Sequence, residues 1–419
     1  MRILQGKAAD AYVRLLERRG SRLDAVEPAV RKIVEDVRRN GDRALLKYAR
    51  NFDGLGTRQK LDVGETELRA AWHAAPKELR AALRVAAKNI RRFCEWQKPK
   101  EWRRTTGGAT LGQLVRPIDS AGCYVPGGRF PLVSTLLMTV IPAQVAGVKN
   151  IRVVSPRPSA EVLAAAGMLG VREFYRTGGA QAIAAFAYGT ETIARVDKIV
   201  GPGNLYVTAA KKLVSFDCAI DMLAGPTEGM IVSSSGNPAF IAADLLAQAE
   251  HDPETLVAFV TTSKKLAQAV DREVENGGHG LPYLRENAIA AQSISSRGAI
   301  LIAPSRTQAF DWANRIAPEH ITIEKRDVSL VQNAGSVFVG DYSAQAAGDY
   351  ASGPNHVLPT AGAARFRGGL SVMDFVKLIT IQELSSRGLN RIAKSAVALA
   401  ETEGLKAHAD SIRVRCAHA

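Results

Sequence analysis

Residues 151–204 read IRVVSPRPSAEVLAAAGMLGVREFYRTGGAQAIAAFAYGTETIARVDKIVGPGN, and this stretch decides the fold. Short apolar runs at Ile151–Ser155, Glu173–Tyr175 and Lys198–Val200 predict strands, whereas Ser159–Leu169 and Ala180–Tyr188 have the spacing of helices. The order is therefore strand, helix, strand, helix, strand. Such alternation predicts a parallel sheet whose strands are joined by right-handed crossovers.

The same alternation continues along the rest of the chain. Further strands are predicted at Ala121–Val125, Met230–Ser233, Leu256–Thr261, Ala299–Ala303, Ile321–Ile323 and Ser336–Val339. Helical patterns at Val133–Gly147, Pro238–His251 and Thr307–Arg315 lie between them. So many strands favour two sheets over one. The first hundred residues are mainly helical, with a stop at Asn40-Gly41, and the chain reads as helical from about Leu370 to its end. We expect an α/β fold of two Rossmann-like parallel-sheet domains flanked by helical segments.

Composition bounds the class of protein. The chain has 419 residues, enough for two or three domains, and no run of eighteen apolar residues that would predict a transmembrane helix. Its beginning has no apolar signal core, so we expect a cytoplasmic protein without membrane association. The four cysteines form no Cys-x-x-Cys pair and predict no disulfide framework. The net charge of +14 is spread over helix faces, which favours a solvated surface; a basic nucleic-acid-binding protein is the remote alternative.

Three glycine-rich loops follow predicted strands, at residues 122–128, 177–181 and 201–204. Open α/β sheets bind ligands at the carboxyl ends of their strands, and helix N-termini attract phosphate. Each loop alone is more often an ordinary turn. Together they favour a nucleotide site, although no standard Gly-x-Gly-x-x-Gly is present. Each loop contributes one aromatic or amide side chain: Tyr124, Gln181 and Asn204.

Nitrogen and oxygen ligands for one metal ion are scattered over the second half of the chain. Gln248 and His251 are three residues apart near a helix end, and Asp349 lies in a turn-rich loop. With His408 they would form a zinc site without a thiolate. The alternative for the first pair is a histidine that only complements the helix dipole.

Ala317-Pro-Glu-His320 places a carboxylate next to an imidazole just before a predicted strand. Glu319 and His320 could act as two bases with different pKa values. A surface ion pair is the alternative interpretation.

The chain resembles the histidinol dehydrogenase family. The resemblance covers about residues 40–411 in order. The segments that carry it are Tyr-Val-Pro-Gly-Gly (124–128), Ile-Pro-Ala-Gln-Val-Ala-Gly-Val (141–148), Gly-Gly-Ala-Gln-Ala-Ile-Ala (178–184), Lys-Ile-Val-Gly-Pro-Gly-Asn (198–204), Ala-Gly-Pro-Thr-Glu (224–228), Asp-Leu-Leu-Ala-Gln-Ala-Glu-His-Asp (244–252), Ala-Pro-Glu-His (317–320), Asn-Ala-Gly-Ser-Val-Phe (333–338), Gly-Asp-Tyr-Ala-Ser-Gly-Pro-Asn-His-Val-Leu-Pro-Thr (348–360) and Glu-Gly-Leu-x-Ala-His (403–408).

The resemblance implies an enzyme that oxidises L-histidinol through L-histidinal to L-histidine with NAD and one zinc ion per subunit. It implies that Glu319 activates water and that His320 is the general base. The other implied roles are NAD contacts by Tyr124, Gln181 and Asn204, zinc ligation by Gln248, His251, Asp349 and His408, and substrate binding by Thr227, Gln248, His251, His320, Asp349, Glu403 and His408.

The resemblance also implies a homodimer with shared active sites. We expect residues 1–17 to form a helical arm, and 18–123 with 226–370 to form the main α/β domain with the zinc and catalytic residues. Residues 124–225 should form the NAD domain, and 371–419 a helical dimerisation segment that completes the partner's active site.

This chain departs from the family at two places. It has Thr227 where the family usually has Ser, and its 129–135 loop differs from the usual run. A related dehydrogenase for another amino or polyol alcohol is therefore the alternative within the same chemistry. A non-catalytic metal-binding scaffold is an alternative of a different class.

Overall fold

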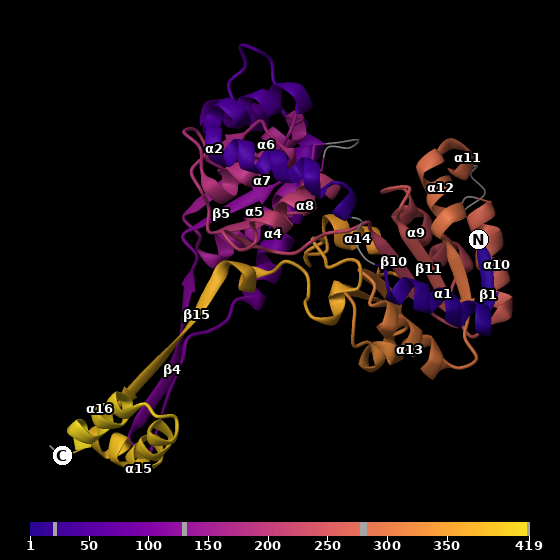
Figure 1. Cartoon of the computed structure of the whole chain (residues 1–419). Coiled ribbons are helices and arrows are strands. Elements are labelled where there is room, and N and C mark those ends of the chain that lie inside the picture. Colours follow the sequence, from indigo (N-terminus) through magenta and orange to yellow (C-terminus); the bar gives the residue numbers. More distant parts are fainter. Residues whose placement is uncertain (20–22, 128–131, 277–282, 417–419) are drawn as a thin grey trace.

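The computed structural model describes residues 1–19, 23–127, 132–276 and 283–416. Two α/β lobes lie side by side, and a long antiparallel ribbon projects from them and ends in a pair of helices (Figure 1). None of the helices in these ranges is long and apolar enough to cross a bilayer.

The first lobe contains a six-stranded sheet in the order β2-β7-β6-β5-β8-β9, parallel except for β2. Its strands are β2 (Asp62–Val63), β5 (Ser120–Tyr124), β6 (Asn150–Val154), β7 (Glu173–Tyr175), β8 (Lys198–Val200) and β9 (Ala219–Ile220). Its crossover helices are α5 (Val133–Ala146), α6 (Ala160–Met168), α7 (Gly179–Tyr188) and α8 (Leu205–Val214). The alternation predicted for residues 151–204 is confirmed. Successive side chains of β6 enter different cores, since Val153 packs with α5 and α6 whereas Val154 packs with α7 and α8.

Three N-terminal helices cover this first sheet: α2 (Glu27–Phe52), α3 (Glu65–Ala74) and α4 (Lys77–Gln97). They contact α7, α6 and α5, respectively. Gly41 interrupts α2 with φ of 49°, at the stop predicted from Asn40-Gly41. This packing differs from the predicted grouping of residues 18–123 with 226–370. An apolar stripe shows that a helix is covered, but it does not say which of two similar sheets covers it.

The second lobe contains a fully parallel sheet in the order β1-β12-β11-β10-β13-β14. Its strands are β1 (Arg2–Gln5), β10 (Glu228–Val232), β11 (Leu256–Thr261), β12 (Ala299–Ile302), β13 (His320–Ile323) and β14 (Ser336–Val339). Helices α1 (Lys7–Glu17) and α13 (Arg306–Ile316) bury one face. The other face is covered by α9 (Pro238–Ala249), α10 (Lys264–Glu275) and α12 (Ala288–Arg297). The N-terminal arm was predicted to be helical, but it begins with the edge strand β1.

Shorter elements complete this lobe and the connections. They are α11 (Tyr283–Glu286), α14 (Gln345–Tyr350), η1 (Leu23–Ala25), η2 (Lys325–Leu330), η3 (Ala363–Arg365) and η4 (Val372–Phe375).

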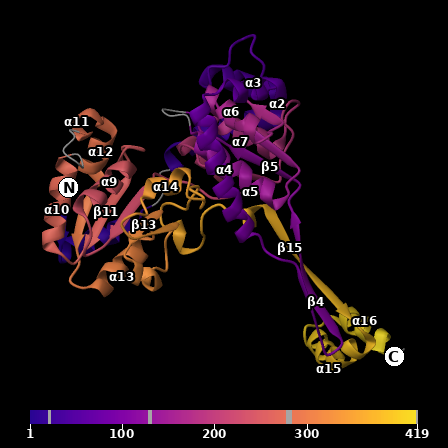
Figure 2. The same cartoon turned by 180° about the vertical axis from the view of Figure 1, so that it is seen from behind.

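The projecting ribbon is an antiparallel sheet of β3 (Trp102–Thr106), β4 (Ala109–Pro117) and β15 (Val376–Leu384). The prediction that the chain is helical from about Leu370 onward is therefore wrong for β15. The residues of this strand lie mostly exposed or half-buried, and they are held by the long register with β4 rather than by a core. Helices α15 (Ser386–Thr402) and α16 (Lys406–Cys416) follow, as predicted, and both views place them at the far end of the ribbon (Figures 1 and 2).

Candidate active site

Glu319 and His320 lie where β13 begins, at the amino end of that strand. Another segment of the second lobe, α14, approaches them. Asp349 comes from α14, and its Oδ1 lies 3.4 Å from Nε2 of His320. On the other side of the ring, Nδ1 lies 3.8 Å from Oε2 of Glu319. Because all three side chains are buried, the surface ion pair considered for Glu319 and His320 is not what the fold forms.

Glu319 is held by the backbone of the neighbouring strand. Its Oε2 accepts a hydrogen bond from the backbone N of Glu228 at 3.0 Å. Burial raises the pKa of Glu319 to about 8, and the nearby His320 opposes the rise. The carboxylate of Glu228 is turned away to Arg19, whose Nε and Nη2 each donate to it at 2.6 Å. Sequence reasoning missed this Arg19–Glu228 pair, because nothing local connects the two residues.

His320 lies between carboxylates. Burial lowers the pKa of His320, but Glu319 and Asp349 outweigh that effect, so the net shift is upward. Burial tends to raise the pKa of Asp349, yet the contact with His320 lowers it overall. The His320 ring also stacks on Phe338, with centroids 5.8 Å apart. A buried imidazole next to one ionised and one readily protonated carboxyl group can take up and release a proton.

Gln248 presents an unusual buried amide. It is 1% exposed, and neither its Oε1 nor its Nε2 has a hydrogen-bond partner in the described part of the chain. Gly229 makes room for it, since a Cβ there would lie 2.8 Å from Cγ of Gln248. An unsatisfied buried amide costs about 1–3 kcal/mol, so the geometry suits a bound ligand. His251 follows the helix and donates from Nδ1 to the backbone O of Gln248 at 3.2 Å, which leaves its Nε2 free for a metal.

His408 and Glu403 are not near these residues. Both are exposed at the far end of the ribbon, His408 in α16 and Glu403 at the end of α15. Both views separate that end from α9 and α14 (Figures 1 and 2). Accordingly, no three His, Cys, Asp or Glu side chains among residues 1–19, 23–127, 132–276 and 283–416 could hold a metal together. Within one chain, α9, which carries Gln248, contacts α14, which carries Asp349, whereas the fourth predicted ligand lies at the end of the ribbon.

The three residues predicted to contact a nucleotide lie at the carboxyl ends of β5, β7 and β8. Tyr124 ends β5, and its hydroxyl accepts from the backbone N of Gly179 at 3.1 Å. Gln181 donates from Nε2 to Asp53 at 3.0 Å. Asn204 caps α8, its Oδ1 accepting from two backbone N–H groups at 3.0 and 3.1 Å. The hydrogen bonds that Gln181 and Asn204 make to described residues thus use one end of each amide.

A buried ion pair supports the loop of Asn204. Lys211, 2% exposed, pairs with Asp221 and also donates to the backbone O of Gly201 at 3.0 Å. The other carboxylate oxygen of Asp221 accepts from the backbone N of Gly201 at 2.7 Å. The pair therefore holds both polar groups of Gly201. In the sequence, Lys211 looks like any lysine of a helix, so no signal pointed to it.

The two places where the sequence departs from the family are the 129–135 loop and Thr227. Gly128 and residues 129–131 of the altered loop lie outside the described residues. Thr227 is half-buried immediately before β10, and its backbone O accepts from Leu256 at 2.9 Å.

His356 links the two lobes beside the site. It donates from Nδ1 to the backbone O of Asp349 at 2.7 Å, and its Nε2 lies 3.3 Å from the hydroxyl of Thr135 in α5. Burial lowers the pKa of His356, so the neutral ring can donate at one nitrogen and accept at the other.

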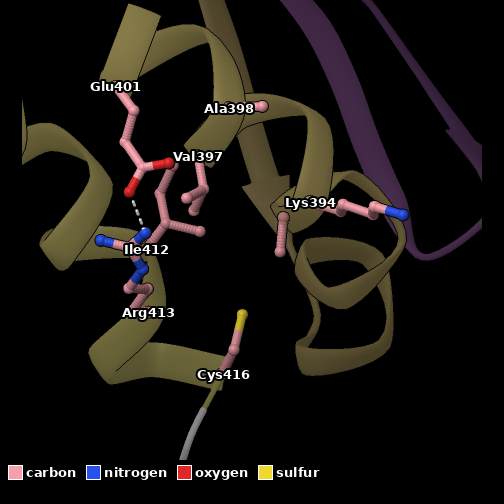
Figure 3. Close-up of a pocket in the computed structure, with 8 residues that line it drawn as sticks. Lys394, Val397, Ala398, Glu401, Ile412, Arg413 and Cys416 are labelled. Carbon is pink, nitrogen blue, oxygen red and sulfur yellow. Dashed lines mark hydrogen bonds and ion pairs between the residues drawn. The ribbon is translucent and has the colours of Figure 1, made fainter. Parts of the chain in front are cut away.

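An open hollow of about 340 Å³ lies between α15 and α16 (Figure 3). Apolar side chains, the Glu401–Arg413 ion pair and Cys416 line it, and it contains none of the predicted site residues. The site formed by the second lobe is therefore the better candidate for chemistry.

Comparison with known proteins identifies relatives over nearly the whole length of the chain. The family model described as histidinol dehydrogenase matches residues 16–416. The histidinol dehydrogenase of Geobacter sulfurreducens is 46% identical over 402 residues, which cover 93% of each chain. That of Thermus thermophilus is 44% identical and covers 97% of this chain and 99% of its own.

Comparison with solved structures also finds a histidinol dehydrogenase. The crystal structure of histidinol dehydrogenase from Elizabethkingia anophelis has a TM-score of 0.93 at 37% identity, covering 99% of this chain and 98% of that one. An acetylating aldehyde dehydrogenase from Geobacillus thermoglucosidasius, at a TM-score of 0.50 and 12% identity over 90% of this chain and 95% of its own, shares the fold alone.

Proposed function

Because the chain belongs to the histidinol dehydrogenase family, we propose that the buried Glu319–His320–Asp349 group is where it oxidises its substrate. The chain is an NAD-dependent oxidoreductase that oxidises histidinol in histidine biosynthesis. What we propose beyond this is the course of the reaction, from L-histidinol through L-histidinal to L-histidine, and the residues that perform it.

His320 is the general base for the alcohol. It is buried, and its Nε2 faces the ionised carboxylate of Asp349, which stabilises the protonated ring after it has taken up the hydroxyl proton. NAD, when bound, accepts a hydride in each of the two oxidations. His320 serves again in the second oxidation, because that step also releases a proton.

Glu319 activates the water that attacks the aldehyde. A general base is most effective when its pKa lies near the working pH, and burial raises that of Glu319 to about 8. The hydrogen bond from the backbone N of Glu228 holds Oε2, so the carboxylate keeps its direction while it takes the water proton.

The zinc ligands we propose are Gln248, His251, Asp349 and His408. The observation that favours this set is the buried amide of Gln248, whose two polar atoms are unpartnered among the described residues. The Nδ1 bond of His251 to the backbone O of Gln248 adds to it, because it directs the lone pair of the ring to Nε2. All four ligands bind through nitrogen or oxygen and none is a thiolate, which is common in catalytic zinc sites. Zinc held there would orient the substrate.

A homodimer would complete the site. Since the ribbon carries Glu403 and His408 away from the lobes of their own chain, we propose that a second copy supplies both. Thr227, Gln248, His251, His320 and Asp349 would then surround the substrate from one chain. Tyr124, Gln181 and Asn204 would hold NAD in the first lobe of that same chain. A cytoplasmic location belongs to the proposal too, as expected for biosynthesis of an amino acid.

NADH formation tests the proposal directly. Purified enzyme is dialysed, supplied with zinc and NAD, and assayed with L-histidinol and with several other amino and polyol alcohols. We expect two NADH formed for each L-histidinol consumed and little with the other alcohols. A preference for another alcohol would mean that Thr227 and the altered loop have changed the substrate. Formation of a single NADH with accumulation of the aldehyde would contradict the four-electron reaction.

A further inference from the structure

We propose that Asp53 is a positioning residue of the NAD site, which acts by holding the amide of Gln181 in one orientation and by fixing the loop before α7. This inference rests on the proposed contact between Gln181 and NAD. Asp53 is not one of the predicted site residues, and none of them is its neighbour in sequence.

One oxygen of Asp53 collects three donors from the first lobe. Asp53 follows the last residue of α2 and is 6% exposed. Its Oδ2 accepts from the hydroxyl of Thr177 at 3.2 Å, from the backbone N of Gly178 at 2.9 Å and from Nε2 of Gln181 at 3.0 Å. Burial raises the pKa of Asp53, whereas these donors favour its ionised form. A charged acceptor makes stronger hydrogen bonds than a neutral one.

The bond to Asp53 decides which way the amide of Gln181 points. With Nε2 directed to the carboxylate, Oε1 lies on the side of Gly179, where a Cβ would come within 2.7 Å of it. Gly179 has φ of 60° and no side chain, so no Cβ crowds Oε1. Without Asp53 the amide could rotate and present N–H groups where it now presents an acceptor. The effect on NAD would pass through Gln181, which is why Asp53 is not itself a contact residue.

The same carboxylate fixes the loop that carries the partner of Tyr124. Gly178 donates its N–H to Asp53, and the next residue, Gly179, donates to the hydroxyl of Tyr124 at 3.1 Å. Pro156 packs against Gly178, since a Cβ there would lie 2.5 Å from it. Loss of Asp53 would therefore loosen two of the three proposed NAD contacts together.

Equilibrium binding of NADH, followed by its own fluorescence in the full-length enzyme, tests the inference without turnover. The variants are Asp53→Ala, Gln181→Ala and the double variant. Asp36→Ala is the matched control. Asp36 lies within α2 and, like Asp53, accepts three hydrogen bonds. They come from Asn40, Lys47 and Tyr48, none of which is a proposed NAD contact.

We expect Asp53→Ala and Gln181→Ala each to raise the Kd for NADH by about tenfold, the size of one lost hydrogen bond. Since one residue acts through the other, the two effects should not multiply in the double variant. Its Kd for NADH should stay close to that of the single variant that binds more weakly. The control should bind as the unchanged enzyme does. Asp53→Asn keeps the size of the side chain and one acceptor oxygen, so it should retain part of the affinity for NADH. If Asp53→Ala does not fold, the Kd of Asp53→Asn tests the inference in its place.

Several results would overturn the inference. A Kd for Asp53→Ala or a folded Asp53→Asn that equals the control would show that Asp53 only anchors α2. Full multiplication of the two single effects in the double variant would show that Asp53 does not act through Gln181. If Gln181→Ala itself leaves the Kd unchanged, the proposed NAD contact of Gln181 fails as well, and this pattern distinguishes the two failures.

Discussion

Replacing Lys211 by Met should destabilise the first lobe and weaken the binding of NAD there. Lys211 and Asp221 are 2% and 6% exposed, and their contact is a buried ion pair. Removal of one partner leaves the other charge in a medium that cannot solvate it. Breaking such a pair costs about 3–5 kcal/mol of unfolding free energy. The backbone O of Gly201 loses its donor too, so the Asn204 loop loses part of its support.

The assay is urea unfolding followed by circular dichroism, together with the Kd for NADH. Lys212→Met is the matched control, because Lys212 is the next residue of α8 and pairs with Glu27 on the surface at 2.8 Å. Exposed pairs contribute little, so this control should unfold as the unchanged enzyme does. We expect Lys211→Met to unfold at clearly lower urea and to bind NADH more weakly.

A second substitution identifies the cause. In Lys211→Met with Asp221→Asn, neither residue of the pair carries a charge, and the asparagine oxygen can still accept from one backbone N–H. This double variant should be more stable than Lys211→Met alone. If it is less stable, or if Lys211→Met matches Lys212→Met, the unpaired charge is not what stabilises this loop and the reasoning is refuted.

Four further predictions concern catalysis and assembly. Glu319→Gln should form the first NADH quickly and the second slowly in a single turnover, whereas His320→Asn should slow both steps; equal slowing of both steps in both variants would contradict separate roles. In the unchanged enzyme the second step should speed up as pH rises through about 8, because ionised Glu319 is the base. Chelation should abolish turnover while circular dichroism stays native-like, and zinc should restore activity; unfolding on chelation would mean a structural metal. Inactive His251→Ala and His408→Ala chains, combined into doubly tagged heterodimers, should regain activity at one of the two sites, whereas no recovery would refute a shared site. Cys123→Ala should keep activity within tenfold, since burial raises the pKa of this thiol to about 12; a thousandfold loss with folding intact would make it the nucleophile.

Much of the candidate site could be predicted because its residues occur in motifs that are continuous in sequence. Glu319 and His320 are neighbours, and Gln248 and His251 lie three apart, so their proximity follows from the chain itself. The contacts of Arg19 with Glu228 and of His356 with Thr135 could not be found in this way. Each of them joins segments that lie far apart in the chain.

The amino-acid sequence by itself determined the alternation of strands and helices in residues 151–204, because periods of 2 and 3.6 residues are local properties of the chain. Only the tertiary structure decided that α2, α3 and α4 pack on the first sheet and that Val376–Leu384 is a strand paired with β4. It also decided that Asp53 meets Gln181 across 128 positions of sequence. In the same way it placed α16, which carries His408, far from α9, which carries Gln248 (Figure 1). The physical reason is that a contact between distant segments depends on which surfaces bury each other, and local periodicity does not encode that choice.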